Sequence, residues 1–383
     1  MPLPTYESRY AELLVDYCLE LTEGDRLFVS TTTLAEPLVR EVYRVALRRG
    51  AHVEVDLEWD GRTRTYLAEA SDAQLRRVST RKREAFGEFE AYLAIRAPFN
   101  LRDLQEAPPD RRALRAEATR ELNQTYFRRT GTRELRRNLC QYPTHAAAQQ
   151  AGMSLDDYRA FVFGACKLDA PDPRAAWLEL RERQQAVTDR LNAARRVRYR
   201  GAGIDVAFDV TGRTWINSDG QTNMPSGEVY TSPVEDSVEG VIRFDYPAVY
   251  QGHEVEGVTL WVERGEVVRF EAARGRDFLA EVLERPGARR FGEVAVGTNY
   301  GIDRFTGNIL FDEKIGGTVH MALGQSYAQC GGRNESPVHW DLIAGMREGG
   351  EIELDGEVVY RDGRFLDYPL GGDGSGNPPG GGT

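Results

Sequence analysis

The sequence has few lysines, few cysteines and no long apolar stretch. Only three of its 49 basic residues are lysines, and the other 46 are arginines. No run approaches the ~20 apolar residues that a membrane-spanning helix needs, so no membrane association is expected. The four cysteines lie far apart and form no CxxC pair, which indicates neither a disulfide framework nor a cysteine zinc site.

The charge balance is acidic. The chain has 49 basic and 60 acidic side chains, a net charge of −11, and an isoelectric point near 5.2. Proteins that bind nucleic-acid phosphates are usually basic, so no nucleic-acid partner is expected. The first residues lack the basic and apolar regions of a signal peptide, and with the sparse cysteines this predicts a cytoplasmic protein.

The 383 residues are enough for two domains, and residues 1–110 have the pattern of the first. Short apolar strands alternate there with helical periodicity, which predicts an N-terminal α/β domain with an open, mostly parallel sheet. One of its helices is expected to begin with a capping box formed by Thr33 and Glu36. The expected strands cover residues 26–30, 52–59 and 91–99.

The sequence pattern of the remaining chain becomes first helix-rich, then strand-rich, and finally glycine-rich. Residues 111–196 are predicted to be a helix-rich connecting region, and residues 197–370 a C-terminal α+β catalytic domain. Two hairpins are expected in that domain, at residues 259–272 and 351–366. Residues 371–383 contain seven glycines and two prolines and are predicted to be a disordered tail.

Two of the five histidines, His320 and His339, lie among carboxylates near the end of the chain. His339 and Asp341 are two residues apart, so on an extended strand they face the same side and can bind one divalent metal ion. Carboxylate and imidazole ligands without thiolates suit zinc, cobalt, manganese or magnesium, and a shared carboxylate would allow a two-metal site. Acidic loops on an acidic protein are the alternative, which explains the carboxylates but not the histidines.

Several blocks of sequence occur together and in order. They are QYPT at 141–144, GRTW at 212–215, NMPSGEVYT at 223–231, FGEVA at 291–295, NILFDEK at 308–314, HMALG at 320–324 and HWDLI at 339–343. Each block is weak by itself, but the set resembles the peptidase family M29, the thermophilic-type metalloaminopeptidases, over most of the chain.

The resemblance implies a metal-dependent aminopeptidase that releases N-terminal amino acids from short peptides with two divalent metal ions in its C-terminal domain. It also implies a homodimer whose active sites face an internal cavity. Carried over by motif, the metal ligands fall on Glu228, Glu293, His320, Tyr327, His339 and Asp341.

Residue roles follow from the chemistry of metal-activated water. A carboxylate must carry a proton to the leaving amine, and Glu228 and Glu313 are the candidates, whereas Glu293 is better placed as the bridging ligand. Tyr327 is expected either to bind metal or to donate a hydrogen bond to the oxyanion. Lys314 either orients Glu313 through an ion pair or is a solvated loop charge.

Two other functions stay open at this point. The same ligands would suit another metal-dependent amidase, deacylase or phosphoesterase. The N-terminal domain would suit a non-catalytic ligand-binding protein, although residues 30–35 contain neither GxGxxG nor a P-loop. Five aromatic residues of the helix-rich region are expected either to form the core that joins the two domains or to build a symmetric dimer interface: Tyr142, Tyr158, Phe161, Phe163 and Trp177.

Overall fold

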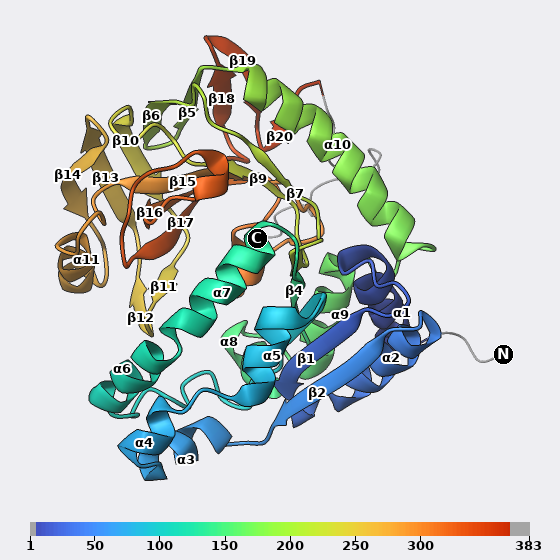
Figure 1. Cartoon of the computed structure of the whole chain (residues 1–383). Helices are drawn as coiled ribbons and strands as arrows, with labels where there is room; N and C mark the ends of the chain where they lie inside the picture. Colours follow the sequence, from blue (N-terminus) through green and yellow to red (C-terminus); the bar gives the residue numbers. More distant parts are fainter. Residues whose placement is uncertain (1–4, 368–383) are drawn as a thin grey trace. The chain divides into compact units, whose positions relative to one another are not determined.

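The computed structural model describes residues 5–367, and the predicted tail at 371–383 lies outside the described residues (Figure 1). The chain forms two compact units. The first runs to Trp177 and takes in Gly220–Ser226, and the second comprises Leu178–Asp219 and continues from Gly227. The division at residue 177 falls inside the region for which the sequence predicts a helix-rich connection. None of the helices among the described residues is long and apolar enough to cross a membrane.

The first unit is built on a five-stranded sheet in the order β2-β1-β3-β4-β8, and every neighbouring pair is parallel. An open parallel sheet is what the alternating pattern predicts. One strand from residues 111–196 also joins this sheet. The sequence did not predict this strand, because its first two residues are arginines and obscure the apolar pattern. The strands are β1 (Arg26–Thr32), β2 (His52–Glu58), β3 (Ala91–Arg96), β4 (Arg136–Gln141) and β8 (Asn223–Met224).

Helices connect and cover these strands. The predicted capping box is wrong: the Thr32 side chain accepts from the Leu34 N–H and caps a short 3-10 turn (Thr33–Ala35). Helix α2 then begins at Glu36 with a proline in its first turn, where the missing N–H carries no penalty. The helices are α1 (Tyr6–Leu13), followed by a π-helical turn (Leu14–Cys18), α2 (Glu36–Arg48), α3 (Arg62–Glu69), α4 (Asp72–Arg76), α5 (Thr80–Glu88), α6 (Pro109–Ala118), α7 (Arg120–Gly131), α8 (His145–Gln150) and α9 (Leu155–Ala165).

The aromatic residues in question belong to the core of this unit. Tyr142, Tyr158, Phe163 and Trp177 are buried, and the Trp177 indole N–H donates to the carbonyl of Cys166 at 2.9 Å. These four side chains are therefore core residues of the first unit, and a role in joining the two predicted domains stays a prediction. They are not available to form the dimer interface that the sequence suggested.

Among its described residues, the second unit contains two antiparallel sheets, a two-stranded antiparallel ribbon and a few helices. Helix α10 (Pro173–Ala193) enters it, and α11 (Arg276–Leu283) and α12 (Ile309–Asp312) follow, with a 3-10 turn at Ala328–Cys330. Its large sheet has the order β14-β13-β10-β6-β5-β18-β19-β20. The strands are β5 (Arg196–Gly201), β6 (Ile204–Asp209), β10 (Glu239–Phe244), β13 (Val258–Glu263), β14 (Glu266–Glu271), β18 (Glu351–Leu354), β19 (Glu357–Arg361) and β20 (Arg364–Phe365).

The two predicted hairpins are present in this sheet, as β13–β14 and β18–β19. A separate two-stranded ribbon joins β11 (Ala248–Tyr250) to β12 (His253–Val255). The smaller sheet has the order β17-β16-β15-β9-β7. Its strands are β7 (Ile216–Ser218), β9 (Glu228–Thr231), β15 (Phe291–Gly297), β16 (Thr318–Gly324) and β17 (His339–Gly345).

The smaller sheet has one apolar face and one polar face. Apolar residues of β15, β16 and β17, such as Val294, Met321 and Leu342, share a core cluster with residues of the large sheet. Successive side chains of a strand point to opposite faces, so Glu293 and His320 lie on the other side. Both central strands are buried along their whole length, and their ionisable side chains are therefore withdrawn from water.

Gly292 lies in a bulge where β15 shifts its register against β16. A Cβ atom at this position would meet the backbone carbonyl oxygens of Gln325 and Gly324 well inside normal contact distance. The Gly292 carbonyl itself accepts a hydrogen bond from the Ser232 hydroxyl at 2.7 Å. Only glycine therefore allows the chain after β16 to approach β15 this closely.

We expect Gly292→Ala to lower the free energy of unfolding by about 3 kcal/mol, because backbone atoms rather than a flexible side chain must move. Gly201→Ala is the matched control in the same unit, since a Cβ atom there has its nearest neighbour at 3.6 Å. The control should change stability by no more than about 0.5 kcal/mol. Urea denaturation of the three proteins measures both values, and equal stabilities would contradict this account of the bulge.

Candidate metal centre

The polar face of the smaller sheet gathers imidazole and carboxylate side chains from four of its strands. Strand register explains why they meet: Glu293 and Asp341 both pair with Ala322, one on each side of β16. Glu313 joins them from the end of α12. The strand residues are Glu228 on β9, Glu293 on β15, His320 on β16, and His339 and Asp341 on β17.

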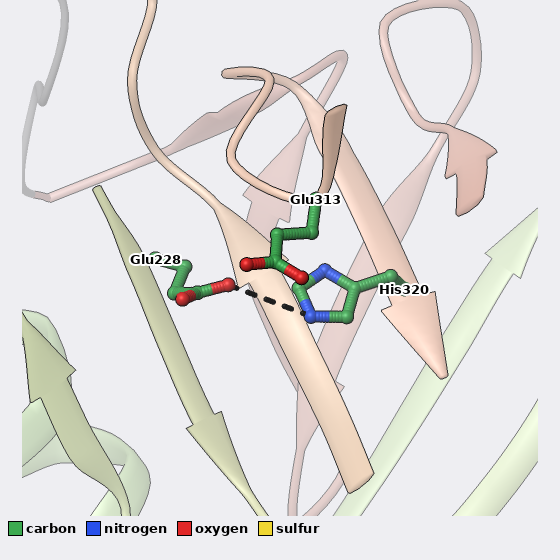
Figure 2. Close-up of side chains that lie close together, drawn as sticks. All are labelled: Glu228, Glu313 and His320. Carbon is green, nitrogen blue, oxygen red and sulfur yellow. Dashed lines mark ion pairs between the residues drawn. The ribbon is translucent and has the colours of Figure 1, made fainter. Parts of the chain in front are cut away.

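The first group consists of Glu228, Glu313 and His320, each of which offers one ligand atom within 4.8 Å of the others. Figure 2 shows the three side chains pointing toward one another. The Nε2 atom of His320 lies 3.6 Å from Oε2 of Glu228. His320 is completely buried, so this group sits below the surface of the unit.

The second group consists of Glu293, His339 and Asp341, whose ligand atoms also lie within 4.8 Å of one another. Nε2 of His339 lies 3.2 Å from Oε2 of Glu293 and 3.7 Å from Oδ1 of Asp341. Nδ1 of His339 is 3.0 Å from the carbonyl oxygen of Gln325. Because a carbonyl only accepts, Nδ1 carries a proton and donates it, which leaves Nε2 directed at the carboxylates.

Glu293 connects the two groups. Its Oε2 atom faces His339, and its Oε1 atom lies 3.6 Å from Nε2 of His320. The carboxylate is 4% exposed and thus almost entirely withdrawn from solvent. One buried carboxylate therefore presents a separate oxygen to each of two candidate cation sites.

Several ligand atoms at this centre have no hydrogen-bond partner although they are buried: Oε2 of Glu228, both ring nitrogens of His320 and Oδ1 of Asp341. An unsatisfied buried polar atom costs about 1–3 kcal/mol, so such atoms need a compensating contact. A divalent cation would supply one for each group. The donor set of nitrogen and oxygen atoms fits zinc, manganese, cobalt or magnesium.

The buried groups shift one another's proton affinities. Burial raises the pKa of Glu228 to about 7 and that of Asp341 to about 6. Burial disfavours charge on the imidazoles, but the carboxylates outweigh it and raise the pKa of His320 to about 9 and that of His339 to about 10. Burial likewise disfavours charge on Glu293, yet the two imidazoles lower its pKa to about 2. A cation that binds here must displace protons from the histidines.

Lys314 lies within this centre and is completely buried. Its ammonium is ion-paired with Glu313 and lies 3.4 Å from Oε1 of Glu228. Burial opposes its charge, but these two carboxylates outweigh burial and raise the pKa of Lys314. The ion-pair interpretation is therefore right, and the solvated-charge interpretation is wrong.

Tyr327 lies beside the second group, with its hydroxyl 3.3 Å from Nε2 of His339. Burial, followed by the charges of Glu293 and Asp341, raises the pKa of Tyr327, so its hydroxyl keeps its proton. The ring of Tyr230 is tilted against it, with centroids 5.3 Å apart. Sequence inspection missed Tyr230, although it lies in the NMPSGEVYT block two residues after Glu228.

The structure brings together every site residue that the sequence singled out. Glu313, expected as a proton carrier, lies close enough to be a ligand of the first group as well. The adjacent Asp312 is used differently, because its carboxylate accepts hydrogen bonds from the N–H and hydroxyl of Thr306 at 2.8 Å each. The role of the Gln325 carbonyl could not be foreseen, since a main-chain atom leaves no signal in the sequence.

Comparison with known proteins finds relatives that span almost the whole chain. Aminopeptidase 2 of Geobacillus stearothermophilus is 29% identical over 398 aligned positions, which cover 93% of this chain and 94% of the relative. Aminopeptidase T of Thermus aquaticus is 29% identical over 391 positions, covering 91% of this chain and 94% of the relative. The structure of wild-type AmpT from Thermus thermophilus matches with a TM-score of 0.81 at 25% identity, over 94% of this chain and 99% of that one.

The family is shown by a match that extends over almost all of the described chain. The model of peptidase family M29, described as thermophilic metalloprotease, matches residues 6–365. That range contains every strand that the structure describes and every residue of the two groups. The chain therefore belongs to the M29 family of thermophilic metalloproteases, as the sequence blocks indicated.

Proposed function

We propose that this metalloprotease is an aminopeptidase that releases N-terminal amino acids from short peptides with the help of two divalent metal ions. Use of a divalent metal follows from the family, and relatives that cover most of the chain are named aminopeptidases. The observation that carries the two-ion proposal is the position of Glu293, which directs one oxygen toward each candidate site.

Residues of both groups would hold the ions. Glu228 and His320 would bind one, His339 and Asp341 the other, and Glu293 would be shared. When bound, such ions polarise a carbonyl group and lower the pKa of water toward ~7. Zinc, cobalt, manganese and magnesium all remain candidates, because oxygen and nitrogen ligands accept each of them.

Glu313 is the better candidate for the proton carrier. Its side chain is 16% exposed, compared with 6% for Glu228, so Glu313 is more open to a substrate and to water. The general acid or base must come within hydrogen-bond reach of the leaving amine, which a sealed side chain cannot do. Glu228 instead directs its unpartnered Oε2 atom toward His320 and is committed to ion binding.

Tyr327 is proposed to stabilise the oxyanion. Its hydroxyl lies beside the second group, 3.3 Å from Nε2 of His339. A neutral donor held in position can form a hydrogen bond to negative charge that develops on a carbonyl oxygen. This assigns Tyr327 a donor role in preference to the ligand role that the resemblance implied.

Family membership supports an enzyme and leaves the non-catalytic ligand-binding alternative without support. An amidase or deacylase on the same site differs only in whether the amino group of the substrate is free. The homodimer and the cytoplasmic location stay predictions from the sequence.

The function is tested with leucine p-nitroanilide and its N-acetylated analogue. We expect the metal-loaded protein to release nitroaniline from the unblocked compound only, and chelation followed by removal of the metal to abolish turnover. Hydrolysis restricted to the acetylated compound would replace the aminopeptidase with a deacylase. Undiminished activity of the metal-free protein would refute metal dependence altogether.

Glu293→Gln should damage the enzyme more than a change at either single group. Loss of the shared charge is expected to lower turnover by more than ~100-fold and to release most of the bound metal, while the neutral amide preserves the fold. Asp341→Asn is the comparison, and it should lose less metal because His339 remains. Elemental analysis and circular dichroism of both variants check this; a Glu293→Gln protein with normal metal content and turnover would remove Glu293 from the centre.

Metal binding should strengthen as the pH rises. Without a cation the imidazoles of His320 and His339, with pKa values of about 9 and 10, are protonated at neutral pH. Because only the neutral ring binds a metal, uptake should release about two protons, and affinity should still be rising above pH 8. Calorimetric titration in two buffers of different ionisation enthalpy counts the protons. Metal binding that releases no protons, with an affinity that does not change with pH, would contradict coordination by these two histidines.

A further inference from the structure

Gln184 is a polar residue of helix α10 whose side chain has no exposed surface. Its Oε1 atom accepts a hydrogen bond from the Thr298 hydroxyl at 2.7 Å. Its Nε2 atom has three oxygens within donor distance: Oδ1 of Asn217 at 2.7 Å, the Ser218 carbonyl at 3.1 Å and the Glu228 carbonyl at 3.3 Å. Burying an amide is costly unless it is hydrogen-bonded, so this position of the helix is tied to these partners.

The partners belong to adjacent parts of the smaller sheet. Ser218 is the last residue of β7 and Thr298 directly follows β15, and these two strands lie on either side of β9. Asn217 returns a second contact to the helix, because its Nδ2 atom donates to the Arg181 carbonyl at 3.0 Å. The amide of one helical residue therefore joins α10 to the ends of three neighbouring strands.

These contacts converge on the residue that precedes the metal-ligand candidate Glu228. The Gly227 N–H donates to the Ser218 carbonyl at 3.1 Å, and the Gly227 carbonyl accepts from the Thr298 N–H at 2.8 Å. The two residues that hold Gly227 in the sheet are thus the same two that Gln184 binds. Gln184 fixes the backbone from which the Glu228 side chain extends, even apart from its direct contact with the Glu228 carbonyl.

This backbone needs such support because Glu228 lies at a strand end. It is the first residue of β9, which is only four residues long. Its Oε2 atom lies 3.6 Å from Nε2 of His320 and has no hydrogen-bond partner. A carboxylate that binds zinc holds its oxygen at ~2.0–2.2 Å from the ion, and a misplacement of about 1 Å at a reaction centre can cost ~100-fold in rate.

We propose that Gln184 is a positioning residue of the metal centre, whose buried amide holds the start of β9 so that Glu228 can bind a divalent cation together with His320. The proposal rests on the metal-dependent function proposed above. Among the described residues, the side chain of Gln184 hydrogen-bonds no carboxylate or imidazole of either group, so it acts only through the position of Glu228. It extends the centre from the smaller sheet to α10.

The test is calorimetric titration of the metal-free protein with Co²⁺ at about pH 8. Gln184→Met keeps an unbranched side chain of similar volume and removes every hydrogen bond of the amide. Supporting residues around a metal ligand are typically worth ~10–100-fold in affinity, so Co²⁺ binding should weaken by at least ~10-fold in one step. The visible absorption of the bound Co²⁺ should also change, since it reports the geometry of the ligands.

Thr188→Val is the matched control. Thr188 is also buried on α10, about one turn after Gln184, and its hydroxyl donates to the Gln184 main-chain carbonyl at 2.8 Å. The substitution therefore removes a buried hydrogen bond from the same helix without changing the contacts at the start of β9. Its Co²⁺ affinity and absorption should equal those of the wild type, and a loss as large as that of Gln184→Met would show a general effect of the helix.

A double variant covers the case in which Gln184→Met does not fold. That substitution leaves the Thr298 hydroxyl buried without its acceptor, whereas Gln184→Met combined with Thr298→Val removes both partners. Replacing both partners of a buried hydrogen bond by apolar groups of similar shape can be nearly neutral for stability. The folded double variant should show the same loss of Co²⁺ affinity, of at least ~10-fold.

The outcomes separate this inference from the proposed function. A folded Gln184→Met or double variant with wild-type affinity and absorption would overturn the role of Gln184 and leave the metal centre intact. A wild-type protein that binds no Co²⁺ would overturn the metal-dependent function itself. If the wild type binds a single ion, the two-ion proposal fails, and the change of that one affinity in Gln184→Met still decides the role of Gln184.

Discussion

The metal centre depends on one interaction, the placement of the Glu293 carboxylate between two imidazoles. One oxygen faces His320 and the other faces His339, at 3.6 and 3.2 Å. Central strand β15 holds the carboxylate there, and the Gly292 bulge brings the chain after β16 close enough for the Gln325 carbonyl to orient His339. The geometry of both groups follows from this single buried carboxylate.

The same sheet serves as core and as active centre because of strand alternation. Val294, Met321 and Leu342 pack into the apolar core, and their neighbours in sequence form the polar face. A register slip of one residue would exchange the two faces, so core burial also fixes the register of the site. Stability and function are therefore coupled in this sheet. The site withdraws four carboxylates from water, and their burial requires positive charge nearby, from side chains or from metal ions.

Positive charge from the protein, and from a metal when one is bound, balances the negative charge of the buried carboxylates. Lys314 supplies a permanent positive charge to the first group, and the histidines supply protons to both groups until a metal replaces them. Buried atoms that remain without hydrogen-bond partners, such as Oε2 of Glu228 and Oδ1 of Asp341, are the atoms that a bound metal would satisfy. The centre thus combines a rigid frame with two groups of candidate metal ligands.

The sequence by itself determined the family and the parallel N-terminal sheet, and it predicted the candidate site residues that the structure brings together, because these follow from local periodicity and from ordered motifs. His339 and Asp341 could be paired from their spacing alone, since a strand places alternate residues on one face. Only the tertiary structure decided whether Lys314 is buried, how Glu293 divides its oxygens, and that β4 joins the sheet. Burial and charge pairing arise between residues far apart in sequence, such as Glu228 and Lys314, and local pattern contains no information about such distances.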